Sequence, residues 1–420
     1  ISLSMHIGLV LATAFISIAT GLLAGIYPAY YMTSFPPALV LKGSFGLSPK
    51  GRQLRNALIG VQYVASFGLI IGATFMYLQN YYMQNTPLGY DKDEIIITNM
   101  NNNIRKSRDA FASQVKSFSG IEEVTYAEML LSSQDQYMGW GRKYRDKDIQ
   151  FQCLPVEPSF LKVMNVKISE GRDFREEDKA KRYGTFVFNE RARTEYGLEI
   201  GSLIDSMEIV GFMPDVKFAS FRTEVTPMAF FVWGTNNWGN QPNYAYIKVK
   251  AGSDLRGAMQ HVKTTLQSFD PEYPFNVRFF DEVLNGLYEK ERSLSSLITL
   301  FSLIAIFISV VGVFGLVVFD SEYRKKEIGI RKVLGSTTEE IIVMFNKTYI
   351  RILCVCFVLG APIAGYVVHR WLENFAYKTP MYWWVYLIAF AIIAVITILT
   401  VTFQNWRAAN ENPVHSIKNE

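Results

Sequence analysis

Charged residues are missing from long stretches of this chain of 420 residues. An apolar run of about 20 residues without charge has the length and composition of a helix that crosses about 30 Å of hydrocarbon. No Asp, Glu, Lys or Arg occurs in residues 1–41, 56–90, 293–319, 352–369 or 379–406. We therefore expect five membrane spans, near residues 7–31, 57–79, 294–319, 350–369 and 382–404. The alternative, five buried helices of a water-soluble protein, would need five such runs without any membrane to explain them.

Cysteine and histidine are also scarce. Cys153 is the only cysteine of the polar block 80–292, so no disulfide forms within that block, and the four histidines are scattered, so no metal site is expected. The motif G-x-x-x-x-G-K-[ST] is absent, which excludes ATP binding in the phosphate-loop manner. No acid–base or nucleophile motif stands out, so no catalytic residue is predicted. The net charge of +4 is too small to imply a nucleic acid partner.

The polar block 80–292 has the size of a folded domain. Strand-like runs lie at 94–98, 185–189, 207–213, 228–233 and 244–250, and helical patterns lie near 104–118, 189–197 and 254–269. The run "YAYIKVK" (244–250) alternates as a half-buried strand does. This is the pattern of a mixed α/β domain. From residue 283 a helical pattern continues into the third span, which predicts one unbroken helix between domain and membrane.

Basic residues predict the orientation in the membrane, because Lys and Arg near span ends mark the cytoplasmic side. One basic group lies at 42–55, between the first two spans, and another at 324–351, between the third and fourth. An even number of spans separates these loops, so both lie on the cytoplasmic side. The block 80–292 is then outside the cytoplasm.

The second basic loop reads "EYRKKEIGIRKVLGSTTEEI" (322–341). Apolar residues such as Ile330 and Leu334 alternate there with basic ones, and Gly335 suits the left-handed conformation that ends a helix. Directly after Gly335, the run S-T-T-E-E contains two overlapping capping boxes, Ser336 with Glu339 and Thr337 with Glu340. Either one would begin a new helix that continues into the fourth span.

Two interpretations of this loop stay open on the residues alone. A solvated loop that sets topology or contacts anionic lipid explains the charges. A helix that docks into a groove on a cytoplasmic partner also explains the interleaved apolar residues.

Small residues four apart indicate where spans approach closely. Gly68 and Gly72 form such a pair in the second span, and Ala361 and Gly365 form one in the fourth.

A weak internal repeat is also visible. The run "YYMTSFPPALVLK" (30–42) aligns without gaps to "WRAANENPVHSIK" (406–418), and each follows a span. The repeat favours a duplication in which residues 1–51 end one unit and residues 52–420 form the next, as in a fragment of a longer protein.

The loop sequence "RKKEIGIRKVLGST" closely resembles the cytoplasmic loop of FtsX/MacB-type ABC transporter permeases, which reads roughly R-x-x-E-I-G-[IL]-x-[KR]-x-[LI]-G-[AS]. The ending "WRAANENPVHSIK" resembles the tail of that family, with Ile417 in place of the usual Leu. The run "VEPSFLKVMNVKISEGRDFREED" (156–178) looks like part of the family's periplasmic core domain.

The resemblance implies a fold: an α-helical transmembrane bundle of five spans with a large extracytoplasmic mixed α/β domain, in the bacterial inner membrane. It implies four parts: the last helix and tail of a preceding unit (1–51), the first helix of a second unit (52–82), the MacB-like periplasmic core domain (83–285) and an FtsX-like domain with three spans (286–420).

The resemblance also implies a function, that of a permease subunit which couples ATP hydrolysis to movement of its periplasmic domain for export or extraction. The residues implied to contact the ATPase are Arg324, Glu327, Ile328, Gly329, Ile330, Arg331, Lys332, Leu334, Gly335 and Ser336. ATP and Mg are expected on a separate ATPase subunit. Other implied partners are a second permease half or copy, membrane lipid and a periplasmic protein. Two alternatives remain: a regulator of a periplasmic hydrolase or signalling protein, and a membrane-anchored sensor without an ATPase.

Overall fold

A computed structural model describes residues 7–8, 11–12, 14–19, 21–22, 49–132, 138–217, 221–236, 242–286, 288–323, 330–331 and 334–409. The chain divides into two compact units. One comprises Ile1–Tyr63, Ile308–Cys356 and Val395–Glu420, and the other comprises Val64–Phe307 and Phe357–Ala394. Within the described residues, four helices are long and apolar enough to cross a membrane. The predicted first span, 7–31, falls largely outside the described residues, so five spans are not established.

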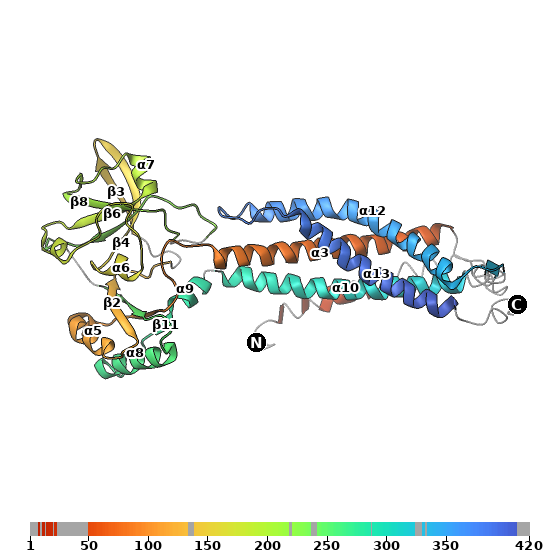
Figure 1. Cartoon of the computed structure of the whole chain (residues 1–420), viewed down its shortest axis with the longest axis horizontal. Coiled ribbons are helices and arrows are strands. Elements are labelled where there is room, and N and C mark those ends of the chain that lie inside the picture. The colour runs from red at the N-terminus through yellow and green to blue at the C-terminus, as the bar shows by residue number, and fades with distance from the viewer. Residues whose placement is uncertain are drawn as a thin grey trace. The chain divides into compact units, whose positions relative to one another are not determined.

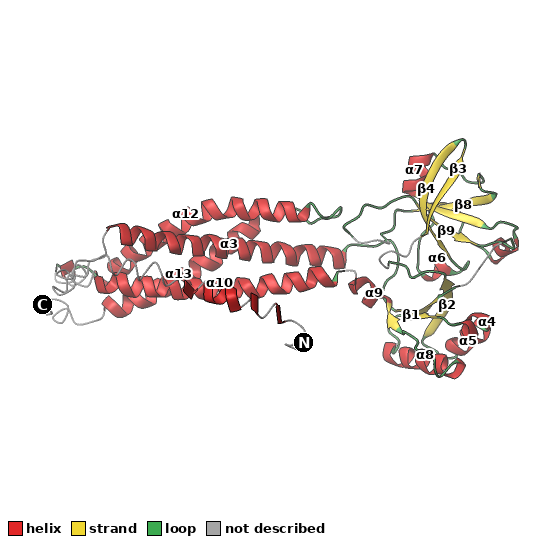
Figure 2. Ribbon diagram, turned by 180° about the vertical axis from the view of Figure 1, so that it is seen from behind, coloured by secondary structure: helices red, strands yellow, loops and turns green. Residues whose placement is uncertain are grey.

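The four candidate membrane helices lie side by side in both views (Figures 1 and 2). They are α3 (Pro49–Asn85), α10 (Glu289–Tyr323), α12 (Thr338–Leu372) and α13 (Trp383–Ala409). Their positions confirm the spans predicted at 57–79, 294–319, 350–369 and 382–404. In the apolar window of α3 44% of the residues are buried, against 11% for α10, so α3 is the more enclosed of the two.

Rings and hydroxyl groups fasten α3 to the other helices. In one unit the Phe67 ring lies 5.2 Å from that of Phe357 on α12, and Ser302 Oγ on α10 donates to the carbonyl of Leu69 at 3.0 Å. In the other unit the hydroxyls of Tyr63 and Thr397 are 3.1 Å apart. Such small polar contacts supplement van der Waals packing between apolar helices.

Two sheets form the α/β domain that follows α3. The four-stranded antiparallel sheet has the order β11 (Arg278–Phe279), β1 (Ile95–Asn99), β10 (Tyr244–Val249), β2 (Ile121–Ala127). The larger sheet has the order β3 (Met138–Tyr144), β4 (Lys147–Pro155), β9 (Met228–Val232), β6 (Thr185–Asn189), β8 (Met207–Met213), β5 (Glu170–Gly171), with β7 (Leu203–Ile204) paired to β8. The short helices are α4 (Asn102–Lys106), α5 (Arg108–Lys116), α6 (Phe160–Val163), the 3-10 helix η2 (Glu176–Ala180), α7 (Glu190–Tyr196), α8 (Leu255–Phe269) and α9 (Phe280–Gly286). The five predicted strands are confirmed as β1, β6, β8, β9 and β10.

Alternation along the strands of the small sheet builds two cores, because successive side chains point to opposite faces. Ile96 and Ile247 point toward α5 and α8, which cover one face (Figure 1). Ile97 and Tyr246 point to the other face, toward the large sheet. The strand β10 is therefore buried on both faces. The prediction that it is only half-buried is wrong, because the large sheet covers the face that was expected to meet water.

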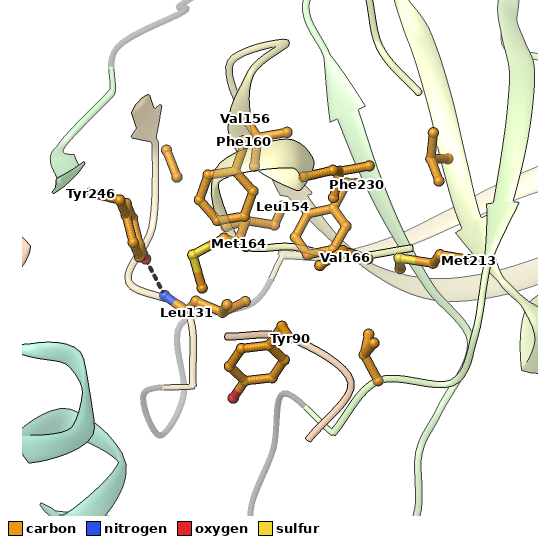
Figure 3. Packing of buried hydrophobic residues seen from close by; sticks show 14 of the residues in the cluster. Tyr90, Leu131, Leu154, Val156, Phe160, Met164, Val166, Met213, Phe230 and Tyr246 are labelled. Carbon is orange, nitrogen blue, oxygen red and sulfur yellow. Dashed lines mark hydrogen bonds between the residues drawn. The ribbon is translucent and has the colours of Figure 1, made fainter. Parts of the chain in front are cut away.

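The core between the two sheets is continuous. Tyr246 from the small sheet and Phe230 from the large sheet both contact Phe160 of α6, with ring centroids 5.1 and 5.6 Å apart (Figure 3). The Tyr246 hydroxyl accepts a 2.7 Å hydrogen bond from the Leu131 amide. Close-packed interiors transmit displacement rather than absorb it, so the two sheets should move as one body.

The predicted unbroken helix from residue 283 into the membrane is wrong. The helix α9 ends at Gly286 and α10 begins at Glu289. Glycine lowers helix propensity by about 1 kcal/mol. In addition, the Tyr288 hydroxyl at the break accepts a hydrogen bond from the Phe221 amide at 3.0 Å, a tertiary contact that local sequence does not reveal.

Candidate coupling site

The loop before α12 contains the helix end that its sequence predicts. Gly335 has φ of +98°, in the left-handed region. The Leu334 amide donates to the Ile330 carbonyl at 3.0 Å, and the Ser336 amide donates to the Arg331 carbonyl at 2.9 Å. The second bond is the one that closes a Schellman motif. We call residues 330–336 the basic turn.

The helix α12 begins with a reciprocal cap directly after this turn. The Thr337 amide donates to Glu340 Oε2 at 3.1 Å, and the Glu340 amide donates to Thr337 Oγ1 at 3.2 Å. Of the two capping boxes left open by the sequence, the structure has the one at 337 and 340. The turn at Gly335 and the start of α12 are therefore both fixed by local hydrogen bonds.

The basic turn presents apolar side chains to its surroundings. Leu334 is 80% exposed and Ile330 is 51% exposed. Arg331 contacts the sulfur of Met344 on α12 at 3.2 Å through Nη1. Of the predicted ATPase-contacting residues, Ile330, Arg331, Leu334, Gly335 and Ser336 are described, whereas Arg324, Glu327, Ile328, Gly329 and Lys332 lie outside the described residues.

A second feature lies where the α/β domain meets the ends of the membrane helices. The loop between β8 and β9 places Phe221, which is 2% exposed, in a cluster of side chains from several helix ends. We call this cluster the aromatic junction, and it comprises Tyr82, Met83, Leu88, Phe221, Tyr288, Trp371, Phe375 and Tyr377.

The rings of the junction meet Phe221 edge to face. Its centroid lies 6.3 Å from Tyr82 at the end of α3, 6.1 Å from Tyr288 before α10, and 5.9 Å from Tyr377 between α12 and α13. Edge-to-face pairs of this kind contribute roughly 0.5–1.5 kcal/mol each beyond the burial of their area. One side chain of the domain thus contacts three separate helix connections.

Backbone hydrogen bonds reinforce the same contacts. The Phe221 amide donates to the Tyr288 hydroxyl at 3.0 Å, and the Phe221 carbonyl accepts from the Tyr377 amide at 3.2 Å. The Lys217 amide donates to the Leu88 carbonyl at 2.8 Å, which ties the β8–β9 loop to the segment leaving α3.

Gln79 secures the α12–α13 connection to α3. Its side chain is fully buried near the end of α3. Its Nε2 donates to the Tyr377 carbonyl at 3.0 Å, and its Oε1 accepts from the Thr379 amide at 2.8 Å. Because a buried amide costs free energy unless it is hydrogen-bonded, this pair of bonds makes the contact specific as well as close.

Cations cover the outer faces of the junction rings. Lys217 Nζ lies 4.5 Å from the Tyr377 centroid and 5.1 Å from that of Phe221, and the Arg222 guanidinium lies 4.9 Å from the Phe375 ring. These distances suit cation–π attraction. Burial lowers the pKa of Lys217 below its ordinary value. A cavity of only about 30 Å³ remains beside Phe221, room for about one water, so the junction is a packing contact and no ligand site.

Two family descriptions match most of the chain. FtsX-like permease C-terminal matches residues 299–413, and MacB-like periplasmic core domain matches residues 58–265. The chain is an FtsX/MacB-like permease. The recognition from the basic loop and the tail is thereby confirmed.

Individual relatives cover part of this permease. The macrolide export ATP-binding/permease protein MacB of Chromobacterium violaceum is 23% identical over 230 residues, which are 52% of this chain and 35% of that protein. MacB of Escherichia coli strain K12 is 23% identical over 233 residues, with the same two coverages. The permease thus aligns with about a third of the length of these relatives.

Solved structures of domains from other transporters are similar to part of the chain. The periplasmic region of MacB from Actinobacillus actinomycetemcomitans has a TM-score of 0.35 and 14% identity, covering 47% of this chain and 94% of that one. The extracellular domain of the noncanonic ABC-type transporter YknZ has a TM-score of 0.32 and 11% identity, covering 44% of this chain and 99% of that one.

The permease is a multi-pass membrane protein with a large α/β domain. Within its described residues, no group of three or more His, Cys, Asp or Glu side chains could hold a metal ion. The description of the matching family, FtsX-like permease, names a permease activity.

The predicted close-packing residues of the permease divide into two kinds. A methyl group built at Gly68 or Gly72 would meet no atom of the described residues within 4 Å, so close packing at that pair stays a prediction. At Gly365 a methyl carbon would lie 2.8 Å from the Tyr386 hydroxyl, and Ala361, one turn earlier, is buried.

Sequence reasoning missed close approaches at other glycines of the permease, Gly60 and Gly360 among them. A methyl carbon at Gly60 would lie 3.4 Å from Cys356 Sγ, and one at Gly360 would lie 3.4 Å from the Cα of Val64. It also missed the junction residues. One available signal was Gln79, because an amide in a largely apolar span indicates a specific contact.

Proposed function

We propose that this permease is the transmembrane subunit of an ABC transporter, which transmits motion from a cytoplasmic ATPase to the α/β domain for export or extraction of a substrate. The observation that carries the proposal is the aromatic junction, where Phe221 of the domain packs against three helix connections. A shift of those helix ends must displace the β8–β9 loop or break the junction.

The elements on either side of the junction are stiff enough for this role. The helix α3 is 37 residues long, or about 55 Å at 1.5 Å per residue, well beyond the ~30 Å of hydrocarbon. On the far side, the continuous core between the sheets makes the α/β domain one packed body. Small displacements at one end of such elements reach the other because packed interiors deform little.

The basic turn is the proposed contact with the ATPase. Its exposed Leu334 and Ile330 would enter an apolar groove, and Arg331 would pair with acids at the rim. The remaining predicted contacts, Arg324, Glu327, Ile328, Gly329, Lys332, Gly335 and Ser336, belong to the same proposal. ATP and Mg would bind the ATPase, here a separate subunit. The relatives named above are ATP-binding/permease proteins, which supports an ATPase partner.

The wider assignment follows from the same proposal. The permease would lie in the bacterial inner membrane, with the basic turn in the cytoplasm and the α/β domain in the periplasm. Residues 52–82, 83–285 and 286–420 would form one unit, and 1–51 the end of a preceding one. A second permease half or copy, membrane lipid and a periplasmic protein would complete the assembly.

Substituting the exposed residues of the turn tests the proposal. The variant carrying Ile330→Asp and Leu334→Asp should lose a co-purifying protein that contains a phosphate-loop motif and hydrolyses MgATP, while the permease still reaches the membrane. Leu203→Asp is the matched control, since Leu203 is 61% exposed on the α/β domain. Undiminished ATPase recovery with the double variant, or equal loss with the control, would refute docking at the turn.

A further inference from the structure

The large sheet of the α/β domain encloses a pocket that the coupling proposal does not use. The sheet curves until its edge strand β3 contacts β7, which is paired to β8 at the other side. The mouth of this curved sheet is a pocket of about 450 Å³. Its apolar walls come from Met138, Trp140, Tyr183, Met207 and Trp233. We call it the tryptophan pocket. This volume and lining are typical of small-molecule sites, which favour the mouths of curved or closed sheets.

The aromatic walls of the tryptophan pocket are held in place from behind. The Trp140 ring lies 4.8 Å from Phe231 and 6.0 Å from Trp233, and Phe231 and Trp233 are 4.7 Å apart. The indole N–H of Trp233 donates to Glu128 Oε1 at 2.8 Å. Because the indole N–H of Trp233 already has a hydrogen-bond partner, a ligand can pack against the apolar face of this ring without leaving the N–H unpaired. A ligand would therefore meet preformed walls and would not have to order them.

Arg142 lies at the rim of the tryptophan pocket. The Arg142 guanidinium lies 4.3 Å from the Trp140 centroid, and Nη1 donates to the Gly141 carbonyl at 2.9 Å. Its Nε pairs with Asp205 Oδ2 at 2.5 Å, where the two side chains are 29% and 58% exposed. Exposed ion pairs contribute only about 0–1 kcal/mol. A ligand carboxylate can therefore replace Asp205 as the ion-pair partner of Arg142 at a small cost in free energy. A cationic ligand would instead have to displace the Arg142 guanidinium from the Trp140 ring.

We propose that the tryptophan pocket binds a small aromatic molecule that carries a carboxylate. The ring system packs against Trp140 and Trp233, and the anion bonds to Arg142, whose planar fork matches a carboxylate. This inference does not rest on the coupling proposal, because it concerns a separate surface and needs no ATPase.

Photolabelling of the full chain in lipid nanodiscs tests the site. The probe is 4-benzoylbenzoate, an aromatic carboxylate whose excited ketone inserts into neighbouring C–H bonds, and labelled peptides are mapped by mass spectrometry. We expect saturable labelling at Met138 and Met207. Arg142→Gln should raise the half-saturating concentration of the probe at least fivefold and leave labelling by neutral benzophenone unchanged. Trp140→Ala should abolish saturable labelling by both compounds.

Arg145→Gln is the matched control. Arg145 also stacks on a ring, that of Tyr144 at 5.2 Å, and pairs with Glu199, but it does not line the pocket. The proposal predicts that this variant labels as the wild type does. Labelling confined to the membrane helices, equal weakening by both arginine variants, or wild-type labelling in Arg142→Gln would each overturn it. Because Arg142 is partly exposed, its variant keeps the test decisive even if Trp140→Ala fails to fold.

Discussion

Removing the ring of Phe221 should detach the α/β domain from the helix ends. Phe221 is 2% exposed and meets three rings at 5.9–6.3 Å. Replacing a buried Phe by Ala costs about 3–5 kcal/mol in a core. The junction is local, so we expect the loss there and not in the whole domain. At about 3 kcal/mol the closed junction would become about a hundredfold less populated relative to its open form.

Amide hydrogen exchange in the full permease measures that change. The Tyr377 amide donates to the Phe221 carbonyl, so peptides covering 371–379 report directly on the junction. In Phe221→Ala their protection should fall on the order of a hundredfold, because exchange there proceeds through local opening. Under the coupling proposal, this variant should still retain an ATPase at the basic turn, but ATP should no longer alter exchange in the domain.

The matched control is Phe111→Ala. Phe111 is fully buried between α5 and the small sheet and has an edge contact with Phe269 at 5.9 Å, so it loses similar packing without touching the junction. Exchange at 371–379 should stay at its wild-type value in this variant. If Phe221→Ala leaves 371–379 protected, or if Phe111→Ala exposes it equally, the junction does not hold the domain to the helices.

Two further predictions concern polar groups. Gln79→Leu leaves the Thr379 amide and the Tyr377 carbonyl without their hydrogen-bond partner, which costs about 1–3 kcal/mol for each buried group. Hydrogen exchange of the Thr379 amide should therefore become faster. Unchanged exchange would contradict the hydrogen bond from this amide to Gln79. Burial alone would raise the pKa of Asp178, but hydrogen bonds from Arg172 and the Arg175 amide outweigh it and lower the pKa. The ionised carboxylate of Asp178 therefore stabilises the fold at pH values above its ordinary pKa of about 3.9, and this contribution is lost as the pH falls through the lowered pKa. In Asp178→Asn, the melting temperature should depend less on pH in the acidic range than it does in the wild type. An unchanged pH dependence would contradict the lowered pKa of Asp178.

Local physics explains which features could be predicted from the sequence. The membrane helices follow from uncharged length alone, and Gly335 with the cap at Thr337 and Glu340 follows from backbone requirements within a few residues. The strands β6 and β8 are apolar runs bounded by polar or turn residues. None of these needs knowledge of a distant partner.

Features that depend on distant partners were not predictable. Alternation in β10 could not show that layers cover both its faces. The approach of Gly365 to Tyr386 joins two helices, and the spacing of small residues alone does not show which neighbour a glycine meets. The junction joins residues that lie more than 130 positions apart, such as Tyr82 and Phe221, and its loop "VKFASFRTEV" (216–225) carries no motif.

The break between α9 and α10 changes the route by which motion would reach the α/β domain under the coupling proposal. A single helix through residues 283–319 would carry force along its own backbone, and no one side chain would be essential. Instead α9 ends at Gly286, and Tyr288 at the break bonds to Phe221. Under the coupling proposal, force from α10, from α3 and from the α12–α13 connection would therefore converge on the same buried ring. If motion is transmitted through packed side chains, removing the Phe221 ring should abolish the transmission. If it were transmitted along one continuous helix, the substitution would leave it intact. The response of Phe221→Ala thus distinguishes a packed junction from a helical lever.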